Sequence, residues 1–178
     1  AVRYVRANAA KLGIDPDKVI ASGGSAGGHL AACTAFVDGF DAADDPKASC
    51  RPNAMVLYNP ALNLTLLKGR EIPGADGKDV ARAISPTLYL SKSAPPAVIF
   101  FGTADRLLAM GTEYVAKAKG LGVRAELYTA ADQPHSFFNR PPWLEATTDR
   151  ADRFLASLGY LTGEPTVKPK ADATLKKE

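Results

Sequence analysis

Residues 19–32 read VIASGGSAGGHLAA, and this stretch decides the fold. Its β-branched, apolar start predicts a strand, its glycines predict a tight turn, and its alanine-rich end predicts a helix. The turn itself, Gly23-Gly24-Ser25-Ala26-Gly27, fits the pattern Gly-x-Ser-x-Gly. With a strand before it and a helix after it, this pattern is typical of a nucleophile elbow, in which a strained turn exposes the serine hydroxyl.

Each residue of the turn has an expected task. We expect glycine at Gly23 and Gly27 because side chains there would collide where the strand and the helix approach each other. The helix directs unpaired N–H groups, and the positive end of its dipole, at Ser25. The N–H of Ala26 is therefore expected to face an oxyanion formed during acyl transfer. The alternatives are a structural glycine turn or one that cradles a phosphate.

Composition restricts the classes of function. The chain has 178 residues, 46% of them hydrophobic and 23% charged, as in an ordinary globular domain. Its net charge is +3, and no basic stripe interleaved with aromatic residues is visible, which argues against nucleic-acid binding. No apolar run approaches about 18 residues, so no membrane span is predicted. Two cysteines do not make a metal site by themselves, and no metal is expected.

Strand and helix patterns alternate along the chain, which predicts an α/β fold with a mostly parallel sheet flanked by helices. The expected strands cover residues 18–22, 54–58, 97–101 and 124–128, and the expected helices cover 2–12, 26–37, 86–90, 110–120 and 143–158. Ser85 is expected to cap the helix that Pro86 begins. Residues 38–46 form a polar, acidic loop, and 60–84 an irregular segment of the length of a lid or pocket wall. From Gly163 to the end, residues 163–178 lack periodicity and predict a disordered tail.

A serine nucleophile needs a base, and the base needs a carboxylate to orient it. The chain has two histidines. His29 lies one helical turn beyond Ser25 and is expected to be structural or to line a pocket, whereas His135 follows the fourth strand in a loop that can reach across. Asp105 follows the third strand and is preferred over Asp132, which lies too close to His135 in sequence to support its ring. The order Ser25, Asp105, His135 is the order of a hydrolase triad, and the alternatives are a helix-capping Asp105 and a surface His135.

Three motifs give the chain a family resemblance. Residues 23–31 (Gly-Gly-Ser-Ala-Gly-Gly-His-Leu-Ala), 100–105 (Phe-Phe-Gly-Thr-Ala-Asp) and 134–139 (Pro-His-Ser-Phe-Phe-Asn) resemble those of α/β-hydrolase esterases of the hormone-sensitive-lipase-like and acetylxylan-esterase-like kind. Residues 1–162 look like the C-terminal part of such a catalytic domain. The resemblance implies hydrolysis of short-chain acyl or acetylated sugar esters through an acyl-enzyme, with Ser25 attacking, His135 moving the proton and Asp105 orienting His135. It implies a small-molecule ester as the partner and no cofactor.

The chain also departs from this family's pattern. The His-Gly-Gly-type loop that usually precedes the elbow is not in the sequence, nor are the strands that normally precede the elbow's strand. We therefore expect a piece whose N-terminal strands are missing, with the elbow strand at an exposed edge that favours homo-oligomers or association with the missing segment. Ser136 stands where the family more often has glycine.

Several alternatives stay open on the sequence. A prolyl-oligopeptidase-type serine peptidase shares the serine motif and the triad order, and an inactive hydrolase-like fragment or binding module is the third reading. Cys33 and Cys50 are either thiols or a disulfide, the latter implying an oxidising compartment. Secretion, a periplasmic location and the bacterial cytoplasm are all compatible with the sequence.

Overall fold

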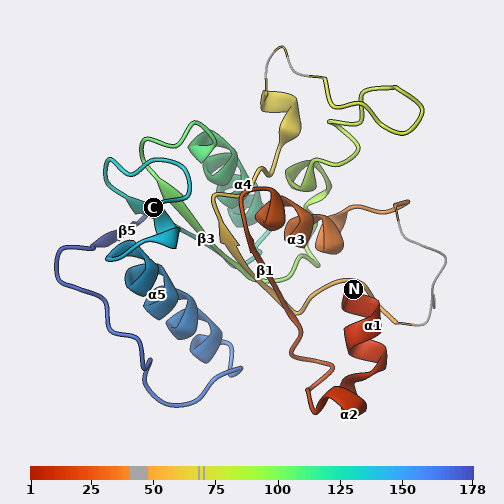
Figure 1. Ribbon diagram of the computed structural model, residues 1–178. Helices are drawn as coiled ribbons and strands as arrows, with labels where there is room; N and C mark the ends of the chain where they lie inside the picture. The colour runs from red at the N-terminus through yellow and green to blue at the C-terminus, as the bar shows by residue number, and fades with distance from the viewer. Residues whose placement is uncertain (41–47, 68, 70) are drawn as a thin grey trace.

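The chain folds around one five-stranded sheet (Figure 1). The computed structural model describes residues 1–40, 48–67, 69 and 71–178. The strands lie side by side in chain order: β1 (Ile20–Gly24), β2 (Ala54–Tyr58), β3 (Ala97–Gly102), β4 (Ala125–Ala130) and β5 (Leu175–Lys177). The first four pair in parallel and β5 pairs antiparallel to β4. The predicted mostly parallel sheet is confirmed.

Helices cover both faces of the sheet. The α-helices are α1 (Val2–Ala7), α2 (Ala9–Leu12), α3 (Ala26–Phe36), α4 (Leu108–Gly120) and α5 (Trp143–Ser157), and the short 3₁₀ helices are η1 (Leu64–Leu66), η2 (Pro86–Tyr89) and η3 (Phe137–Asn139). Helices α3 and α4 pack on one face, and α5 lies on the opposite face (Figure 1). Among the described residues, none of these helices is long and apolar enough to cross a membrane.

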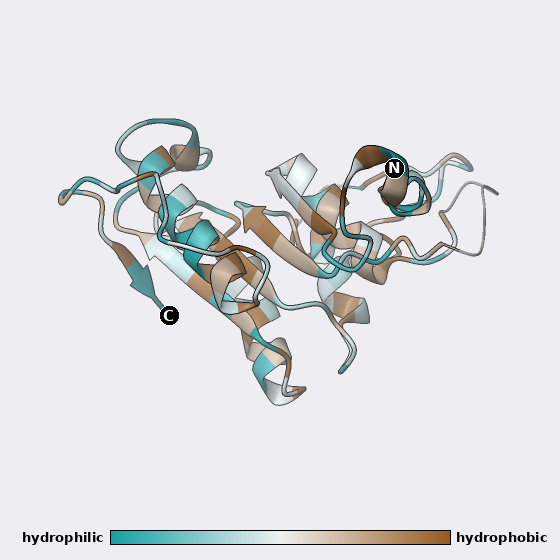
Figure 2. Cartoon of the chain, turned by 90° about the horizontal axis from the view of Figure 1, so that it is seen from below, coloured by the Kyte–Doolittle hydropathy of each residue, from teal (hydrophilic) through white to brown (hydrophobic). Residues whose placement is uncertain are grey.

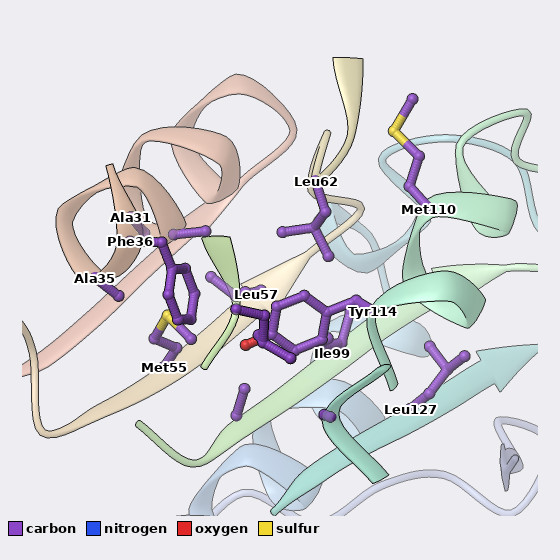
Figure 3. Packing of buried hydrophobic residues seen from close by; sticks show 14 of the residues in the cluster. Ala31, Ala35, Phe36, Met55, Leu57, Leu62, Ile99, Met110, Tyr114 and Leu127 are labelled. Atoms are coloured by element: carbon purple, nitrogen blue, oxygen red, sulfur yellow. The ribbon is translucent and has the colours of Figure 1, made fainter. Parts of the chain in front are cut away.

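Alternate residues of the central strands fill two cores, as the period of a strand requires. Figure 3 shows the first core, in which Phe36 of α3 and Tyr114 of α4 pack over Met55, Leu57 and Ile99 of the sheet. The second core lies beneath α5 and contains Val56, Val98, Phe100, Tyr128 and Phe154. Strand β3 is buried along its whole length, which agrees with its continuous apolar sequence. Figure 2 shows these hydrophobic strands inside the molecule and the hydrophilic β5 at its C-terminal end.

Two differences from the predicted bounds have a clear structural cause, and the other predicted elements end within two residues of their expected bounds. Strand β1 runs from Ile20 to Gly24 and so includes the glycines, because the parallel ladder with β2 continues to the pair Gly24 and Tyr58. The predicted helix over 2–12 is divided into α1 and α2 at Asn8, whose φ of −105° and ψ of 19° interrupt the helical backbone.

The predicted disordered tail is wrong at its end. Leu175–Lys177 form β5 and pair with Tyr128, Thr129 and Ala130 of β4. Beyond the strand, the Glu178 carboxylate accepts a hydrogen bond of 2.7 Å from the Thr129 hydroxyl. A three-residue strand has no internal periodicity to detect, so its presence depends on the neighbouring strand rather than on local sequence.

The two loops of interest are only partly described. Within the predicted acidic loop over 38–46, residues 41–46 lie outside the described residues, and so do 68 and 70 of the segment 60–84. The rest of 60–84 contains η1 and a turn closed by a bridge between Pro73 and Asp79. Cys33 and Cys50 are both thiols, so the alternative of a disulfide is not seen.

Candidate active site

The backbone at Ser25 is held in a sparsely populated conformation. Its φ is 52° and its ψ is −116°, and a positive φ is unfavourable for a residue with a side chain. The surrounding hydrogen bonds hold it there: the Ser25 N–H donates to the Tyr58 carbonyl at 2.8 Å, and the Ser25 carbonyl accepts from the His29 N–H at 3.0 Å. The turn from β1 to α3 thus has the geometry expected of a nucleophile elbow.

The glycines of this turn divide into those that the packing requires and one that it does not. A Cβ on Gly23 would collide with the backbone of Gly27 and lie 2.8 Å from the Gly28 nitrogen. A Cβ on Gly28 would lie 2.8 Å from the Gly23 carbonyl oxygen, and one on Gly24 would collide with the Phe138 ring. A Cβ on Gly27 would meet nothing within 4 Å. The steric reason predicted for Gly27 is therefore wrong, because the close approach of strand and helix falls at Gly23 and Gly28.

The side chains of Ser25, His135 and Asp105 form a chain of hydrogen bonds. The His135 Nε2 lies 2.8 Å from the Ser25 Oγ, and the His135 Nδ1 lies 2.7 Å from the Asp105 Oδ2. The three residues follow β1, β4 and β3, whose carboxyl ends meet at one edge of the parallel sheet. The Asp105 side chain is completely buried, whereas the His135 side chain is 37% exposed.

Asp105 has the hydrogen-bond donors that a buried carboxylate requires. Its Oδ1 accepts the Leu107 N–H at 2.9 Å, and its Oδ2 accepts the Asn59 Nδ2–H at 2.7 Å in addition to His135. Asn59 follows β2, is fully buried and has a φ of 45°. No sequence pattern marks Asn59 as a residue of this site. The one hint in the sequence is that Asn59 directly follows β2, the strand between those that precede Ser25 and Asp105.

The loops that carry Asp105 and His135 are joined through their backbones. The Ala104 N–H donates to the Gln133 carbonyl at 3.1 Å, and the Asp132 N–H donates to the Thr103 hydroxyl at 2.8 Å. A side chain on Gly102 would collide with that same Gln133 carbonyl. Asp132 thus contributes its backbone to the junction, and the carboxylate bonded to the His135 ring is that of Asp105.

Ser136 adopts a φ of 67°, the left-handed region in which glycine has the least strain. Glycine, which α/β-hydrolase esterases more often have at this position, would adopt this φ with less strain than Ser136. The Ser136 N–H donates to the Asn59 Oδ1 at 3.2 Å, which ties the residue after His135 to the end of β2.

The side chain of His29 bonds to groups other than Ser25, Asp105 and His135. Its Nδ1 is 2.7 Å from the Ala61 carbonyl oxygen, and its Nε2 is 3.5 Å from the Cys33 Sγ. Burial raises the pKa of the Cys33 thiol to about 11, so Cys33 is a protonated thiol at neutral pH and a poor nucleophile. Both residues line a cavity of about 760 Å³ between α1 and α3, whose lining does not include Ser25.

The described part of the chain holds no cluster of three or more His, Cys, Asp or Glu side chains suited to a metal ion. The functional groups that the structure brings together are thus one hydroxyl, one imidazole and one buried carboxylate. Together they can transfer a proton away from the hydroxyl and stabilise the imidazolium that forms.

Comparisons with known proteins agree with this fold and identify relatives. The model of the BD-FAE family matches residues 1–116. Esterase LipQ from Mycobacterium tuberculosis is 28% identical over 159 residues, which cover 78% of this chain and 37% of LipQ.

Solved structures of esterase 2 from Thermogutta terrifontis are similar over most of the chain. The apo form has a TM-score of 0.83 and 37% identity, covering 92% of this chain and 64% of that one. The propionate-bound form has a TM-score of 0.82 and 36% identity with the same coverage, and the form phosphorylated by paraoxon has a TM-score of 0.82 and 36% identity, covering 92% and 62%. The chain thus spans less than two thirds of the length of each of these relatives. It belongs to the BD-FAE family and has the fold of the α/β-hydrolase esterases and lipases.

Proposed function

We propose that this chain carries the catalytic machinery of a serine carboxylic-ester hydrolase. The observation that supports this most strongly is the unbroken path of hydrogen bonds from the Ser25 Oγ through the His135 ring to the Asp105 carboxylate, at 2.8 Å and 2.7 Å. Relatives described as esterases support the same class of reaction. The specific roles that follow are those of acyl transfer.

In the first half of the reaction Ser25 is the nucleophile. With the Nδ1–H of His135 donated to Asp105, the Nε2 accepts the Ser25 proton as the Oγ attacks the ester carbonyl carbon. Asp105 stays ionised and stabilises the imidazolium. His135 then gives the proton to the leaving alcohol oxygen, the carbon–oxygen bond breaks, and an acyl group remains on Ser25.

The tetrahedral intermediate needs donors for its oxyanion, and Ala26 supplies one. Ala26 is the first residue of the 11-residue helix α3, so its N–H has no carbonyl four residues earlier within that helix. The positive end of the helix dipole lies at the same place. Removing one such donor typically costs about 10²–10³ in rate, so this N–H is a substantial part of the catalysis.

Hydrolysis of the acyl-enzyme repeats the same steps with water. His135, neutral again after the alcohol leaves, removes a proton from a water molecule that attacks the acyl carbon. The Ser25 Oγ then leaves and takes back the proton from the Nε2. The products are a carboxylic acid and the free enzyme, so the cycle requires neither a metal nor a cofactor.

The acyl groups are proposed to be short. Esterase 2 from Thermogutta terrifontis is described with propionate and with butyrate bound, and as phosphorylated by paraoxon. By analogy we propose acyl chains of the length of acetate to butyrate, with acetylated sugars among the natural alcohols. We also expect Ser25 to react with organophosphates.

Ester hydrolysis is preferred over peptide hydrolysis because LipQ and the Thermogutta terrifontis protein are described as esterases. The test compares p-nitrophenyl acetate and p-nitrophenyl butyrate with a dipeptide p-nitroanilide, which release coloured products of similar size. We expect hydrolysis of both esters, no release from the anilide, and loss of ester hydrolysis in Ser25→Ala. Faster release from the anilide would favour the peptidase, and equal ester hydrolysis in Ser25→Ala would refute the assigned nucleophile.

A further inference from the structure

Asn59, at the end of β2, connects the two loops that carry Asp105 and His135. Its Nδ2–H donates to the Asp105 Oδ2 at 2.7 Å, its Oδ1 accepts the Ser136 N–H at 3.2 Å, and its own N–H donates to the Phe100 carbonyl at 2.8 Å. The residue is fully buried, so water does not compete for these bonds. One amide thus touches both the carboxylate and the residue that follows His135.

We infer that Asn59 is a positioning residue, whose amide holds the Asp105 carboxylate and the His135 loop in register and thereby sets how firmly His135 holds its proton. This inference rests on the function proposed above. The inference goes beyond that function because Asn59 contacts neither the substrate nor Ser25 and acts through Asp105.

The chemistry of an amide suits this position. The Asp105 Oδ2 accepts two hydrogen bonds, one from His135 and one from Asn59. The Nδ2 is a neutral donor that does not titrate, so it satisfies the buried oxygen without competing with the imidazolium for the negative charge. A cationic donor would weaken the attraction between Asp105 and the imidazolium, and an acceptor would repel the carboxylate.

The backbone at this position narrows the useful substitutions. Asn59 has a φ of 45°, a region that asparagine, aspartate and glycine tolerate better than other residues. Asn59→Asp keeps the shape, the backbone preference and an acceptor for the Ser136 N–H, but replaces the donor to Asp105 with a second carboxyl oxygen. The substitution therefore changes the contact with Asp105 and keeps the hydrogen bond from Ser136.

Asn63 provides a matched control. It also follows β2 and is 3% exposed, and its Nδ2 lies 3.0 Å and 2.9 Å from the two carboxylate oxygens of Glu113. Asn63→Asp therefore places one carboxyl group against another in the same way, without touching Asp105 or His135. Any general effect of a buried carboxyl pair on stability will be seen in both variants.

The first measurement is the NMR titration of histidine labelled with ¹⁵N in its ring. The chain has two histidines, so His29 is an internal reference for His135. In Asn59→Asp two buried carboxyl groups share one proton beside the ring, and transfer of that proton to the ring is favoured because it leaves both carboxylates next to an imidazolium. We therefore expect the titration midpoint of the coupled His135 ring to rise by about one pH unit. We expect His29 to be unchanged, and both rings to be unchanged in Asn63→Asp.

The second measurement is the pH dependence of p-nitrophenyl acetate hydrolysis. In Asn59→Asp we expect the acid limb of kcat/KM to move to higher pH by about one unit, with KM unchanged because Asn59 does not contact the substrate. Asn59→Gly, which fits the backbone and removes the amide, is expected to lower kcat at least about tenfold across the whole pH range.

The outcomes separate this inference from the proposed function. A folded Asn59→Asp whose His135 midpoint equals that of the wild type would refute the inference, as would an equal shift in Asn63→Asp. If Asn59→Asp does not fold, Asn59→Gly decides: an unaltered His135 ring resonance and rate refute the role. If the wild type does not hydrolyse esters, the proposed function fails while the NMR titration still tests whether Asn59 controls His135.

Discussion

Ser25, Asp105 and His135 were predictable as a group because each lies in a recognisable local setting. Ser25 is in a glycine-rich turn, and the other two lie in loops after predicted strands, in the order typical of hydrolases. Asn59 has no such setting: it is a single asparagine after a strand, and its role depends on contacts 46 and 77 residues away. Local patterns cannot reveal a contact of that kind.

The glycines of the elbow give a paired prediction at the residue scale. Gly28→Ala places a Cβ 2.8 Å from the Gly23 carbonyl oxygen, so we expect a loss of about 1–3 kcal/mol in the free energy of unfolding. Gly27→Ala meets open space in a helix, so we expect unchanged stability or a gain of up to about 1 kcal/mol. Urea denaturation measures both, and equal effects of the two substitutions would contradict the packing described for the turn.

At the scale of single elements, Ser85 shows where local patterns fail. The sequence predicts it as a helix cap, yet its side chain makes no capping hydrogen bond to η2. Its hydroxyl donates to the Ala81 carbonyl at 2.6 Å and accepts the Leu64 N–H at 2.8 Å. The cap prediction is wrong because two partners from the loop 60–84 bind the hydroxyl instead. Serine followed by proline indicates the helix correctly and says nothing of those partners.

The Ser85 hydroxyl therefore stabilises the loop 60–84. Ser85→Ala leaves the buried Leu64 N–H without its acceptor, and we expect a loss of about 1–3 kcal/mol in unfolding free energy. The matched control is Ser91→Ala, at an exposed serine, which we expect to change stability by less than about 0.5 kcal/mol. Urea denaturation of both variants tests this, and a Ser85 effect as small as that of Ser91 would show that the hydroxyl does not hold the loop.

For the whole molecule, the sheet and its layers were predictable and the last strand was not. The apolar runs of β2 and β3 and the alternating helices are long enough to indicate buried parallel strands. The three residues of β5 are too few to show a pattern, and side chains of β4 add contacts to the backbone pairing of the two strands. Glu126 of β4 accepts hydrogen bonds from Lys177 of β5 at 2.9 Å, from Arg124 at 2.7 Å and from the Tyr128 hydroxyl at 2.9 Å.

These contacts make part of the stability depend on pH. Burial opposes the ionisation of Glu126, but the hydrogen bonds from Lys177, Arg124 and Tyr128 outweigh it and lower its pKa from 4.5 to about 2. Because the folded pKa is below the ordinary value, the stabilisation is complete above pH 4.5 and is lost as the pH falls toward 2. We expect Glu126→Gln to lower the unfolding free energy by about 1 kcal/mol at pH 7 and by less at pH 3.

Urea denaturation at pH 7, 4 and 3 measures that difference. Glu71→Gln, at an exposed residue, is the control and should differ from wild type by less than about 0.5 kcal/mol at pH 7. A Glu126→Gln effect that is the same at pH 7 and pH 3 would contradict the role assigned to the ionised carboxylate.

The reaction of the folded chain with paraoxon, followed by mass spectrometry, tests the central claim most directly. An activated Ser25 displaces p-nitrophenolate and keeps a diethylphosphoryl group, so the adduct reports the nucleophile without needing the natural substrate. We expect one such group on the peptide that contains Ser25, a stoichiometric release of p-nitrophenolate, and neither in Ser25→Ala. A folded wild-type chain that gains no adduct, or that gains it equally in Ser25→Ala, would contradict the assignment of Ser25, His135 and Asp105 as a catalytic group.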